Sequence, residues 1–509
     1  MKQLLALVGV LSLATLSFGQ GLTGSISGNV SDPSGSAVAG VPVKVTNIST
    51  NQVRQATTEA NGDFVFTQLL PGTFRLEVSA KGFKRYEQNS IVLTATERVV
   101  VKRVELQLGE ITQTIEVTAE TARLQTQSAE RSGLISLAQT QNVPLKGRDY
   151  LGLIKLLPGV IDTANRNAPG WNNLGGITIN GNRPGTINLT LDGISSLDTG
   201  SMGGPYLAPS LDAVAEVKVL LTNYQAEYGR SSGGTINTVI KSGTREFHGG
   251  AYYFVRNEAL NANEFFRNRD GLRRPQYRFN YPGYFLGGPV PMGKFNKNRD
   301  KLFFFWSQEF LPRNYPTDLF RRTFPTALQR NGDFSQTFDT NRTLIPIWDP
   351  LNNRVPFPGN RVPTNRIDRN GQALLNIFPQ PNAVDPTRNF NALIQSTVNQ
   401  PRRDSILRVD YNIGSKTQFY WRGINDYEAF KGEFDFVLAS SSWPQLPIKY
   451  QIRSAGMVST LIHTFSPTLV NEFTFGVNRA LQTVDPLTDA GLARNVRSNV
   501  TPNLPQFFP

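Results

Sequence analysis

The sequence contains no cysteine and only two histidines, His248 and His463, among its 509 residues. Without cysteine there are no disulfides, thiolate nucleophiles, iron–sulfur clusters or cysteine-rich zinc sites. Two isolated histidines are too few for a multi-histidine metal centre and argue against a histidine-based catalytic triad. We therefore expect no catalytic residues, no metal site and no cofactor. Charged residues make up only 18% of the chain and aromatic residues 10%, a balance typical of a β-rich protein and not of a disordered one.

Long apolar runs are also missing. No stretch of about 18 uninterrupted apolar residues follows the amino terminus, which excludes a helical membrane protein but not a β-barrel, whose strands alternate between lipid and lumen. At the amino terminus, a basic start and the apolar run 4–16 precede small residues at Ser17 and Gly19. This pattern predicts a secretory signal peptide over residues 1–19, cut between Gly19 and Gln20. The run is too short for a membrane anchor, which needs about 20 residues.

Residues 22–108 contain short strand candidates separated by turns. The candidates cover 25–31, 41–47, 54–58, 63–67, 73–80 and, as two further strands, 91–108. Asn61-Gly62 permits the positive φ of a hairpin, and Pro71-Gly72 sets a tight turn. Seven short strands in fewer than about 90 residues favour a small β-sandwich.

Four motifs in this region carry a family resemblance. They are SGNVSDPSG (27–35), VPVKV (41–45), TEANGDF (58–64) and LPGTF (70–74). Together they resemble the carboxypeptidase regulatory-like domain. The resemblance implies a transthyretin-like sandwich, grouped with carbohydrate-binding-like folds, and no catalytic residues.

Between residues 109 and 241 the pattern changes to mixed helix and strand. We expect short helices at 136–143 and 149–157, a strand pair within 175–192, and strands at 214–221 and 233–240. These elements predict a small α+β unit.

Motifs in this α+β unit occur in the order found in the plug of TonB-dependent outer-membrane receptors. They are VPLKGRDY (143–150), LPGV (157–160), NGNR (180–183), LDG (191–193) and EYGR (227–230), followed by KSGTREFHG (241–249), which resembles the plug-to-barrel passage of the Oar-like branch. Arg245 stands where that family usually has asparagine. The resemblance implies a plug over 113–243 and the beginning of an Oar-like outer-membrane β-barrel over 244–509.

The barrel segment is rich in aromatic residues. Strand candidates cover 249–254, 281–288, 302–310, 405–413, 416–424, 452–463 and 468–480. Their alternation suits a two-faced barrel strand, although a soluble β-sandwich would show it too. Between them, the proline- and asparagine-rich stretch 312–400 resembles the long external loop of Oar-like barrels. The fold class is therefore mainly β: a sandwich, an α+β plug and the first strands of an incomplete barrel.

The number of strand candidates is too small for a complete barrel. Plugged transporters close about 22 strands of about 9–11 residues each, whereas we find seven candidates after residue 244. The sequence also ends on Pro509, which cannot donate a hydrogen bond to a closing strand pair. We expect this sequence to be the amino-terminal part of a longer receptor.

The net charge of +13 is concentrated in the barrel segment, where residues 244–509 hold 32 Lys or Arg against 21 Asp or Glu. No recognition motif accompanies these cations, so we expect no nucleic-acid partner. They could draw anionic ligands or contact lipopolysaccharide through their summed field, and an ordinary solvated surface explains them equally well.

The resemblance implies a receptor that binds a ligand outside the cell and passes it into the periplasm, driven by TonB and its inner-membrane energising complex. Carbohydrate, peptide and metal-chelate ligands all remain open, and outer-membrane lipid is an expected partner. TonB coupling needs an extended strand that can add to a partner sheet. The β-branched alternation after the sandwich meets this need and gives the TonB-contact residues Thr114, Ile115, Glu116, Val117 and Thr118. The alternative is that these residues form the last strand of the sandwich or the first of the plug.

Four plug residues could face a ligand or tie the plug to the barrel wall: Arg148, Arg183, Asp192 and Arg230. We favour the tie, because such residues more often form hydrogen-bonded pairs. An enzyme would need a carboxylate pair such as Asp426 and Glu428, which share a strand face, but nothing else supports that chemistry. The alternative function is a surface adhesin or carbohydrate-binding outer-membrane protein without transport.

Overall fold

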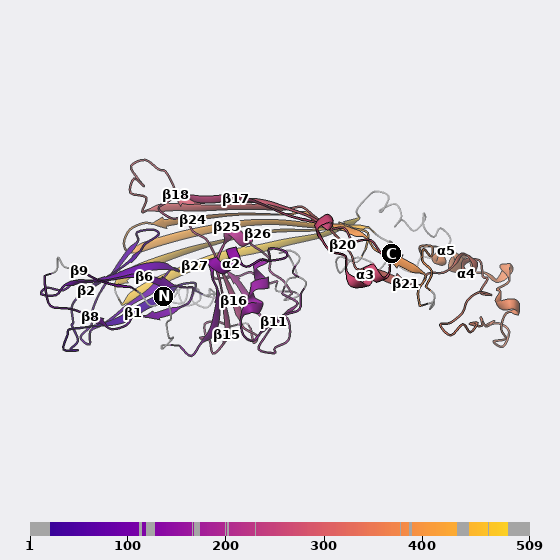
Figure 1. Ribbon diagram of the computed structural model, residues 1–509, viewed down its shortest axis with the longest axis horizontal. Helices are drawn as coiled ribbons and strands as arrows, with labels where there is room; N and C mark the ends of the chain where they lie inside the picture. The colour runs from indigo at the N-terminus through magenta and orange to yellow at the C-terminus, as the bar shows by residue number, and fades with distance from the viewer. Residues whose placement is uncertain are drawn as a thin grey trace, which may run out of the picture.

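The computed structural model describes residues 21–110, 114–118, 128–164, 166, 174–198, 200, 203–229, 231–376, 378–385, 389–434, 447–466 and 468–486. The predicted signal peptide and its cleavage site at Gly19 and Gln20 lie outside these residues. The fold is mainly β, as predicted. Figure 1 shows a small sandwich at one end, a mixed unit beside it, and a layer of long strands that passes over both.

The amino-terminal part is a sandwich of two sheets. Its strands are β1 Gly24–Ser31, β2 Pro42–Asn47, β3 Val53–Thr57, β4 Asp63–Leu69, β5 Gly72–Val78, β6 Arg85–Leu93, β7 Arg98–Val100 and β8 Val104–Glu105. One sheet joins β4, β1, β7 and β8, and the other has the order β3-β2-β5-β6-β9. In β5 the side chains of Phe74, Leu76 and Val78 are buried, so the alternation in the sequence correctly identifies the core face.

Strand β9 (Thr114–Thr118) is the segment predicted to contact TonB. It pairs in parallel with β6, with Thr114 opposite Arg85 and Thr118 opposite Asn89. Among the described residues, β9 is the edge strand of this sheet.

The mixed unit, which we call the plug unit, comprises the described residues from 128 to 241. Its elements are β10 Arg131–Ile135, α2 Leu137–Asn142, the 3-10 helix η1 Tyr150–Leu156, β11 Val160–Asp162, β12 Ile177–Ile179, β13 Asn188–Leu191, β14 Ile194–Ser195, η2 Leu211–Ala213, β15 Val214–Thr222 and β16 Thr235–Ile240. Both predicted helices are present. Ser136 and Gln139 form a capping box on the first, and Asp149 caps the second.

One pairing prediction in the plug unit is wrong. Strands β12 and β13 both lie within 175–192 but do not pair with each other. Instead β12 pairs with β11, while β13 pairs with β14 and β16. The turn 180–185 is long enough to carry the chain from one sheet to the other, which local sequence does not reveal.

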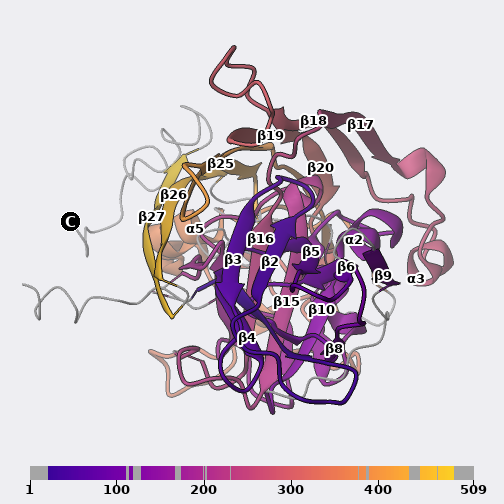
Figure 2. The same cartoon turned by 90° about the vertical axis from the view of Figure 1, so that its left-hand side faces the viewer.

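The third part is a sheet of long strands, which we call the wall. It contains β17 His248–Asn257, β18 Arg278–Pro289, β19 Leu302–Leu311, β24 Arg402–Asn412, β25 Thr417–Gly432, β26 Ile448–Ser466 and β27 Leu469–Pro486, all antiparallel neighbours in this order. Each predicted barrel strand corresponds to one of them. Figure 2 shows the wall as an open arc around the plug unit, with β17 and β27 at its two ends. The connection between β17 and β18 carries η3 Glu258–Leu260 and α3 Phe265–Arg269.

The stretch 312–400, predicted as a long loop, has a structure of its own. Its elements are β20 Arg313–Pro316, β21 Phe320–Arg322, α4 Ala327–Arg330, η4 Pro358–Asn360, η5 Thr364–Arg366, α5 Arg369–Leu375, β22 Ala392–Ile394 and β23 Thr397–Asn399. Buried polar side chains and an apolar cluster that includes Phe324 and Ile394 hold it together. Arg330 donates to the carbonyls of Leu375, Phe378 and Pro379 at 2.6 to 2.9 Å, and the Asn360 amide donates to two further carbonyls at 2.7 and 2.9 Å.

The two ends of the wall differ in their connections. One end carries the long connections 258–277, 312–401 and 433–447, and the other end carries 290–301, 413–416 and 467–468. In outer-membrane barrels the short turns face the periplasm and the long loops face outward. We call the two ends external and periplasmic on this basis. Among the described residues, no helix is long and apolar enough to cross a membrane.

Candidate functional site: the contact between plug unit and wall

A two-residue turn brings Asp192 to the wall. Strands β13 and β14 form a hairpin in which Leu191 pairs with Ile194, so Asp192 and Gly193 are the turn residues. Their φ angles of 50° and 80° are those of a type I′ turn, for which Asp-Gly is a preferred sequence. The Asp192 side chain is completely buried at the tip of this turn.

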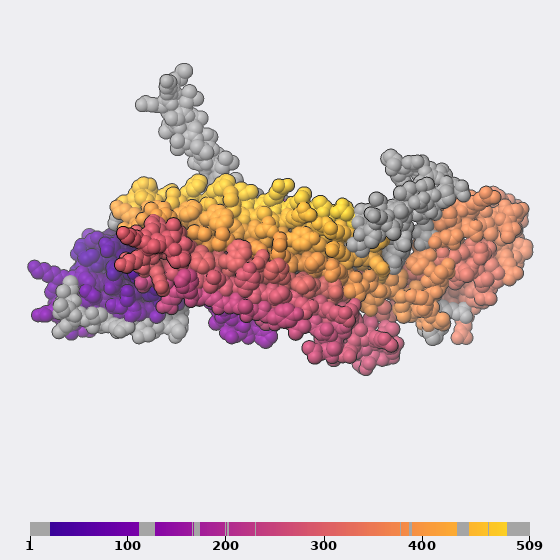
Figure 3. Space-filling model, turned by 90° about the horizontal axis from the view of Figure 1, so that it is seen from above, coloured from indigo at the N-terminus to yellow at the C-terminus, as the bar shows by residue number. Residues whose placement is uncertain are grey.

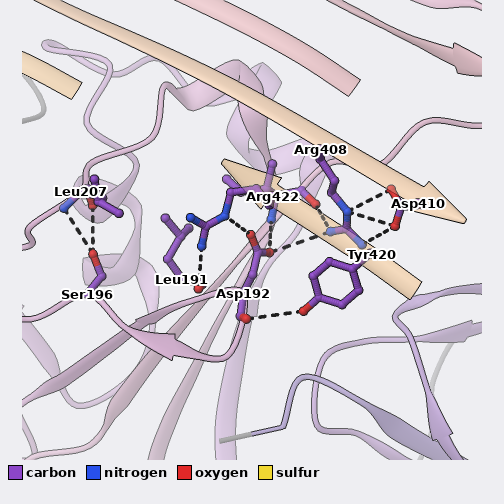
Figure 4. A network of polar contacts seen from close by, with 9 residues as sticks. Leu191, Asp192, Ser196, Leu207, Arg408, Asp410, Tyr420 and Arg422 are labelled. Atoms are coloured by element: carbon purple, nitrogen blue, oxygen red, sulfur yellow. Dashed lines mark hydrogen bonds and ion pairs between the residues drawn. The ribbon is translucent and has the colours of Figure 1, made fainter. Parts of the chain in front are cut away.

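Two arginines on the wall converge on this carboxylate. Arg408 of β24 and Arg422 of β25 are direct cross-strand partners. Like charges placed opposite each other destabilise a sheet. Asp192 lies between them: Arg422 Nε is 2.9 Å from one carboxylate oxygen, and Arg408 Nη1 is 3.8 Å from the other (Figure 4). The plug unit therefore supplies the negative charge that this arginine pair requires.

Further hydrogen bonds complete the cluster. The Ile240 N–H donates to Asp192 at 3.0 Å, and Arg408 donates back to the Ile240 carbonyl at 2.8 Å. Arg422 also donates to the Leu191 carbonyl at 3.1 Å. Asp410 binds Arg408 with contacts of 2.9 to 3.1 Å. Two cations and two anions are thus balanced in a buried network that spans both units.

Arg148 makes a second contact with the wall. It has a φ of +57° and lies after Gly147, so the backbone turns sharply at this point. Its guanidinium binds Glu309 of β19 at 3.0 to 3.1 Å and also pairs with Asp212 of the plug unit. The Tyr252 hydroxyl donates to the same Glu309 carboxylate at 2.9 Å, and the Tyr252 ring lies 4.7 Å from the Arg148 guanidinium.

A third contact between the plug unit and the wall involves three carboxylates on neighbouring wall strands. Glu309, Asp404 and Asp426 are successive cross-strand neighbours on β19, β24 and β25. Arg402 neutralises part of this row, with contacts of 3.0 and 2.8 Å to Asp426, and also donates to the carbonyl of Ala208 in the plug unit. The Ser210 N–H, also in the plug unit, donates to Asp404 at 3.1 Å.

The other residues singled out in the sequence lie elsewhere. Arg183 is exposed in the turn 180–185 and, within the described part of the chain, makes no ion pair. Arg230 lies outside the described residues. Thr114 to Thr118 form β9, away from this contact. The carboxylate pair considered for an enzyme lies on the inner face of β25, where Asp426 binds Arg402 and Glu428 binds Arg313 at 3.1 Å.

The wall residues of the site are absent from the sequence-based list. They are Glu309, Arg402, Arg408, Asp410 and Arg422. The sequence could have indicated Arg408 and Asp410, because they lie on the same face of an alternating strand as the buried Ile406. Charged residues on the core side of a strand indicate partners from another unit. Among the described residues, no cluster of three or more His, Asp or Glu side chains could hold a metal ion.

The sandwich also contacts the plug unit and the wall. Glu216 of β15 accepts a hydrogen bond of 2.6 Å from the Ala95 N–H of the sandwich. The Thr23 hydroxyl donates to Glu472 of β27 at 2.7 Å. Burial raises the pKa of the Glu216 carboxyl to about 7, since the Ala95 N–H and Lys218 compensate only partly. Glu216 is therefore a titratable group in this interface whose charge changes near neutral pH.

This pKa predicts a pH-dependent stability. The folded-state pKa lies above the unfolded value, so the folded protein binds more protons between about pH 4.5 and 7 and stability falls as the pH rises through this window. Across this window we expect the free energy of unfolding of the wild type to fall by up to about 3 kcal/mol relative to that of Glu216→Gln. The glutamine side chain still accepts the hydrogen bond but cannot ionise. Urea unfolding at several pH values measures the difference. Parallel pH profiles for the two proteins would contradict it.

Comparisons with known proteins identify two matching family models and one curated relative. The family model described as outer membrane beta barrel domain matches residues 239–509, and that of the carboxypeptidase regulatory-like domain matches residues 25–107. The TonB-dependent transporter Oar of Myxococcus xanthus is 29% identical over 264 residues, which are 50% of this chain and 24% of that protein. This chain therefore spans about a quarter of that relative's length.

Two solved structures also align with part of this chain. A ferric enterobactin receptor, PfeA, from Pseudomonas aeruginosa aligns with a TM-score of 0.39 and 11% identity over 70% of this chain and 41% of its own. The outer membrane transporter YddB from Escherichia coli aligns with a TM-score of 0.39 and 12% identity over 68% of this chain and 38% of its own.

Proposed function

Because this chain belongs to the outer membrane beta barrel domain family and so lies in the outer membrane, we propose that it acts in a TonB-dependent receptor. Such a receptor binds a ligand outside the cell and transports it into the periplasm through coupling to TonB. The name of its relative, TonB-dependent transporter Oar, supports this assignment. The ligand class stays open between carbohydrate, peptide and metal chelate.

The observation that carries the proposal is the way in which the plug unit fills the arc of the wall. Its contact with the wall combines the polar groups of Arg148, Asp192 and Ser210 with an apolar cluster, in which four plug residues pack against three wall residues: Leu191, Leu207, Ala213 and Ile240 against Phe305, Ile406 and Ile424. Buried ion pairs are a weak source of net stability, since desolvation offsets most of the attraction. In the proposed receptor this contact closes the lumen. Its polar part can exchange partners for water when the plug is pulled, whereas its apolar part resists that exchange.

The coupling segment in this proposal is β9. It is the last strand of the sandwich along the chain, precedes the plug unit and lies at the edge of its sheet, where its backbone groups pair on one side with β6. An edge strand can add to the sheet of a partner protein. We propose that β9 leaves β6 to pair with TonB, so that a pull on β9 is transmitted to the plug unit. Transport of this kind needs no catalytic group, and we propose that the protein is not an enzyme.

Cross-linking tests the coupling segment, and the absence of cysteine makes single-cysteine variants unambiguous. We expect Ile115→Cys to form a disulfide adduct with a TonB that carries one cysteine in its periplasmic domain, because pairing brings the two strands into contact. The matched control is Gln55→Cys on β3, the opposite edge of the same sheet, which should give only background adduct. Equal adduct yields for the two variants would contradict the proposed role of β9.

A further inference from the structure

The outward face of the wall changes chemistry along its length. On β26 and β27 most outward side chains in the middle of the wall are apolar, with Ser459 among them; Met457, Leu461, Phe473, Phe475 and Val477 are exposed by 39, 38, 61, 50 and 48%. This face is seen from outside in Figure 3, where it runs from β17 to the yellow β27. Exposed apolar side chains over this span match the lipid-facing band of an outer-membrane barrel, which is about 25 Å tall.

Aromatic side chains mark the external border of this band. Tyr253, Tyr284 and Phe310 project outward there and are 63, 42 and 36% exposed. Tyr427 continues the row, because Phe310 and Tyr427 both pair with Arg403 in the sheet. Aromatic girdles of this kind lie at the level of lipid headgroups.

Cations occur at the same level as this girdle. Arg403, Tyr427 and Arg453 are successive cross-strand neighbours on β24, β25 and β26, so their side chains share the outward face. Together with Lys449 they line an open groove of about 690 Å³. Phe310 also lines the groove, so basic and aromatic side chains lie together in it.

The cations of this groove lack anionic partners in the described part of the chain. Neither Arg403 nor Lys449 nor Arg453 forms an ion pair there, and Arg453 donates only to the Gln451 side chain at 3.3 Å. Asp426 also lines the groove, but Arg402 binds its carboxylate from the inner face. Asp485 is the cross-strand neighbour of Lys449, without an ion-pair contact. The groove thus holds an excess of positive charge.

We propose that this groove binds the phosphate group of an anionic lipid in the outer leaflet. Arg403 and Arg453 would bind the phosphate through charge-assisted hydrogen bonds, and Lys449 would add a third positive charge. The acyl chains of the same lipid would cover the apolar band directly below. This continuity favours a lipid over a soluble anion, because a free phosphate gains nothing from the apolar surface. The inference rests on the outer-membrane location and is independent of transport.

Lipid binding to the purified intact protein tests the inference. Native mass spectrometry in mild detergent measures binding of bisphosphorylated lipid A. For Arg403→Gln/Lys449→Gln/Arg453→Gln we expect affinity to fall by about tenfold or more, since the variant loses all three positive charges that would bind the phosphate. The matched control is Lys294→Gln/Lys297→Gln/Arg299→Gln, which removes the same charge from an exposed connection at the periplasmic end and should bind like the wild type.

Two further measurements distinguish a lipid phosphate from free inorganic phosphate as the bound group. Dephosphorylated lipid A should bind the wild type as weakly as bisphosphorylated lipid A binds the groove variant, and inorganic phosphate should not compete. Equal binding by the wild type and the groove variant overturns the inference, as does full competition by inorganic phosphate. If the triple variant loses its heat-modifiable gel mobility, the single variants Arg403→Gln and Arg453→Gln replace it, each with a smaller expected loss.

Discussion

Replacing Asp192 by asparagine is expected to lower the free energy of unfolding by about 3–5 kcal/mol. The substitution keeps the size of the side chain and suits the positive φ of 50° at this position, so the turn itself is preserved. It removes the charge between Arg408 and Arg422, which then face each other in a buried site with only Asp410 to balance them. Urea unfolding in detergent, followed by loss of heat-modifiable mobility, measures the change.

Two controls separate this effect from a general cost of mutation. Asp318→Asn removes an exposed carboxylate and should change stability by less than about 0.5 kcal/mol. Adding Arg422→Gln to Asp192→Asn removes one cation together with the anion, so part of the lost stability should return. If Asp192→Asn unfolds like the wild type, the cluster does not hold the plug unit against the wall.

In a full-length receptor, deleting residues 113–119 is expected to abolish uptake and leave ligand binding intact. The deletion removes β9, the proposed TonB partner, but no residue of the contact between plug unit and wall. The direct measurement is binding of the purified periplasmic domain of TonB to the intact protein, which should become undetectable. Without a bound TonB, no pulling force reaches the plug unit.

The control for this deletion keeps the chain length. Replacing Thr114 to Thr118 by a Gly/Ser segment of equal length preserves the spacing between sandwich and plug unit but lowers strand propensity. It should lose TonB binding as the deletion does. If both variants bind TonB and retain uptake, β9 is a structural strand of the sandwich and the coupling segment lies elsewhere.

Local sequence was sufficient for much of the fold. The alternation of Phe74, Leu76 and Val78 identifies a buried face, and the buried face is the one observed. Ser136 and Asp149 mark the starts of two short helices because their side chains cap free N–H groups. The Asp-Gly pair at 192–193 forms the turn that its φ preferences require. In each case the determining interaction lies within a few residues.

Partners distant in the sequence could not be found in this way. The strands β12 and β13 are neighbours in sequence yet belong to different sheets, because each finds its partner elsewhere. The stretch 312–400 reads as a loop because its stabilising contacts, such as those of Arg330 and Asn360, join side chains to backbone carbonyls. Hydrogen bonds of this kind leave no periodic pattern.

The sequence by itself determined the mainly β class, the positions of most strands along the chain and the turn that presents Asp192. These depend on side-chain alternation and on φ preferences, both of which are local. Only the tertiary structure decided which side chains the Asp192 carboxylate contacts. The register sets Arg408 opposite Arg422, and the docking that inserts the Asp192 carboxylate between them joins residues more than 200 positions apart. Their pairing follows from the balance of buried charge, a property of the assembled fold and not of any segment.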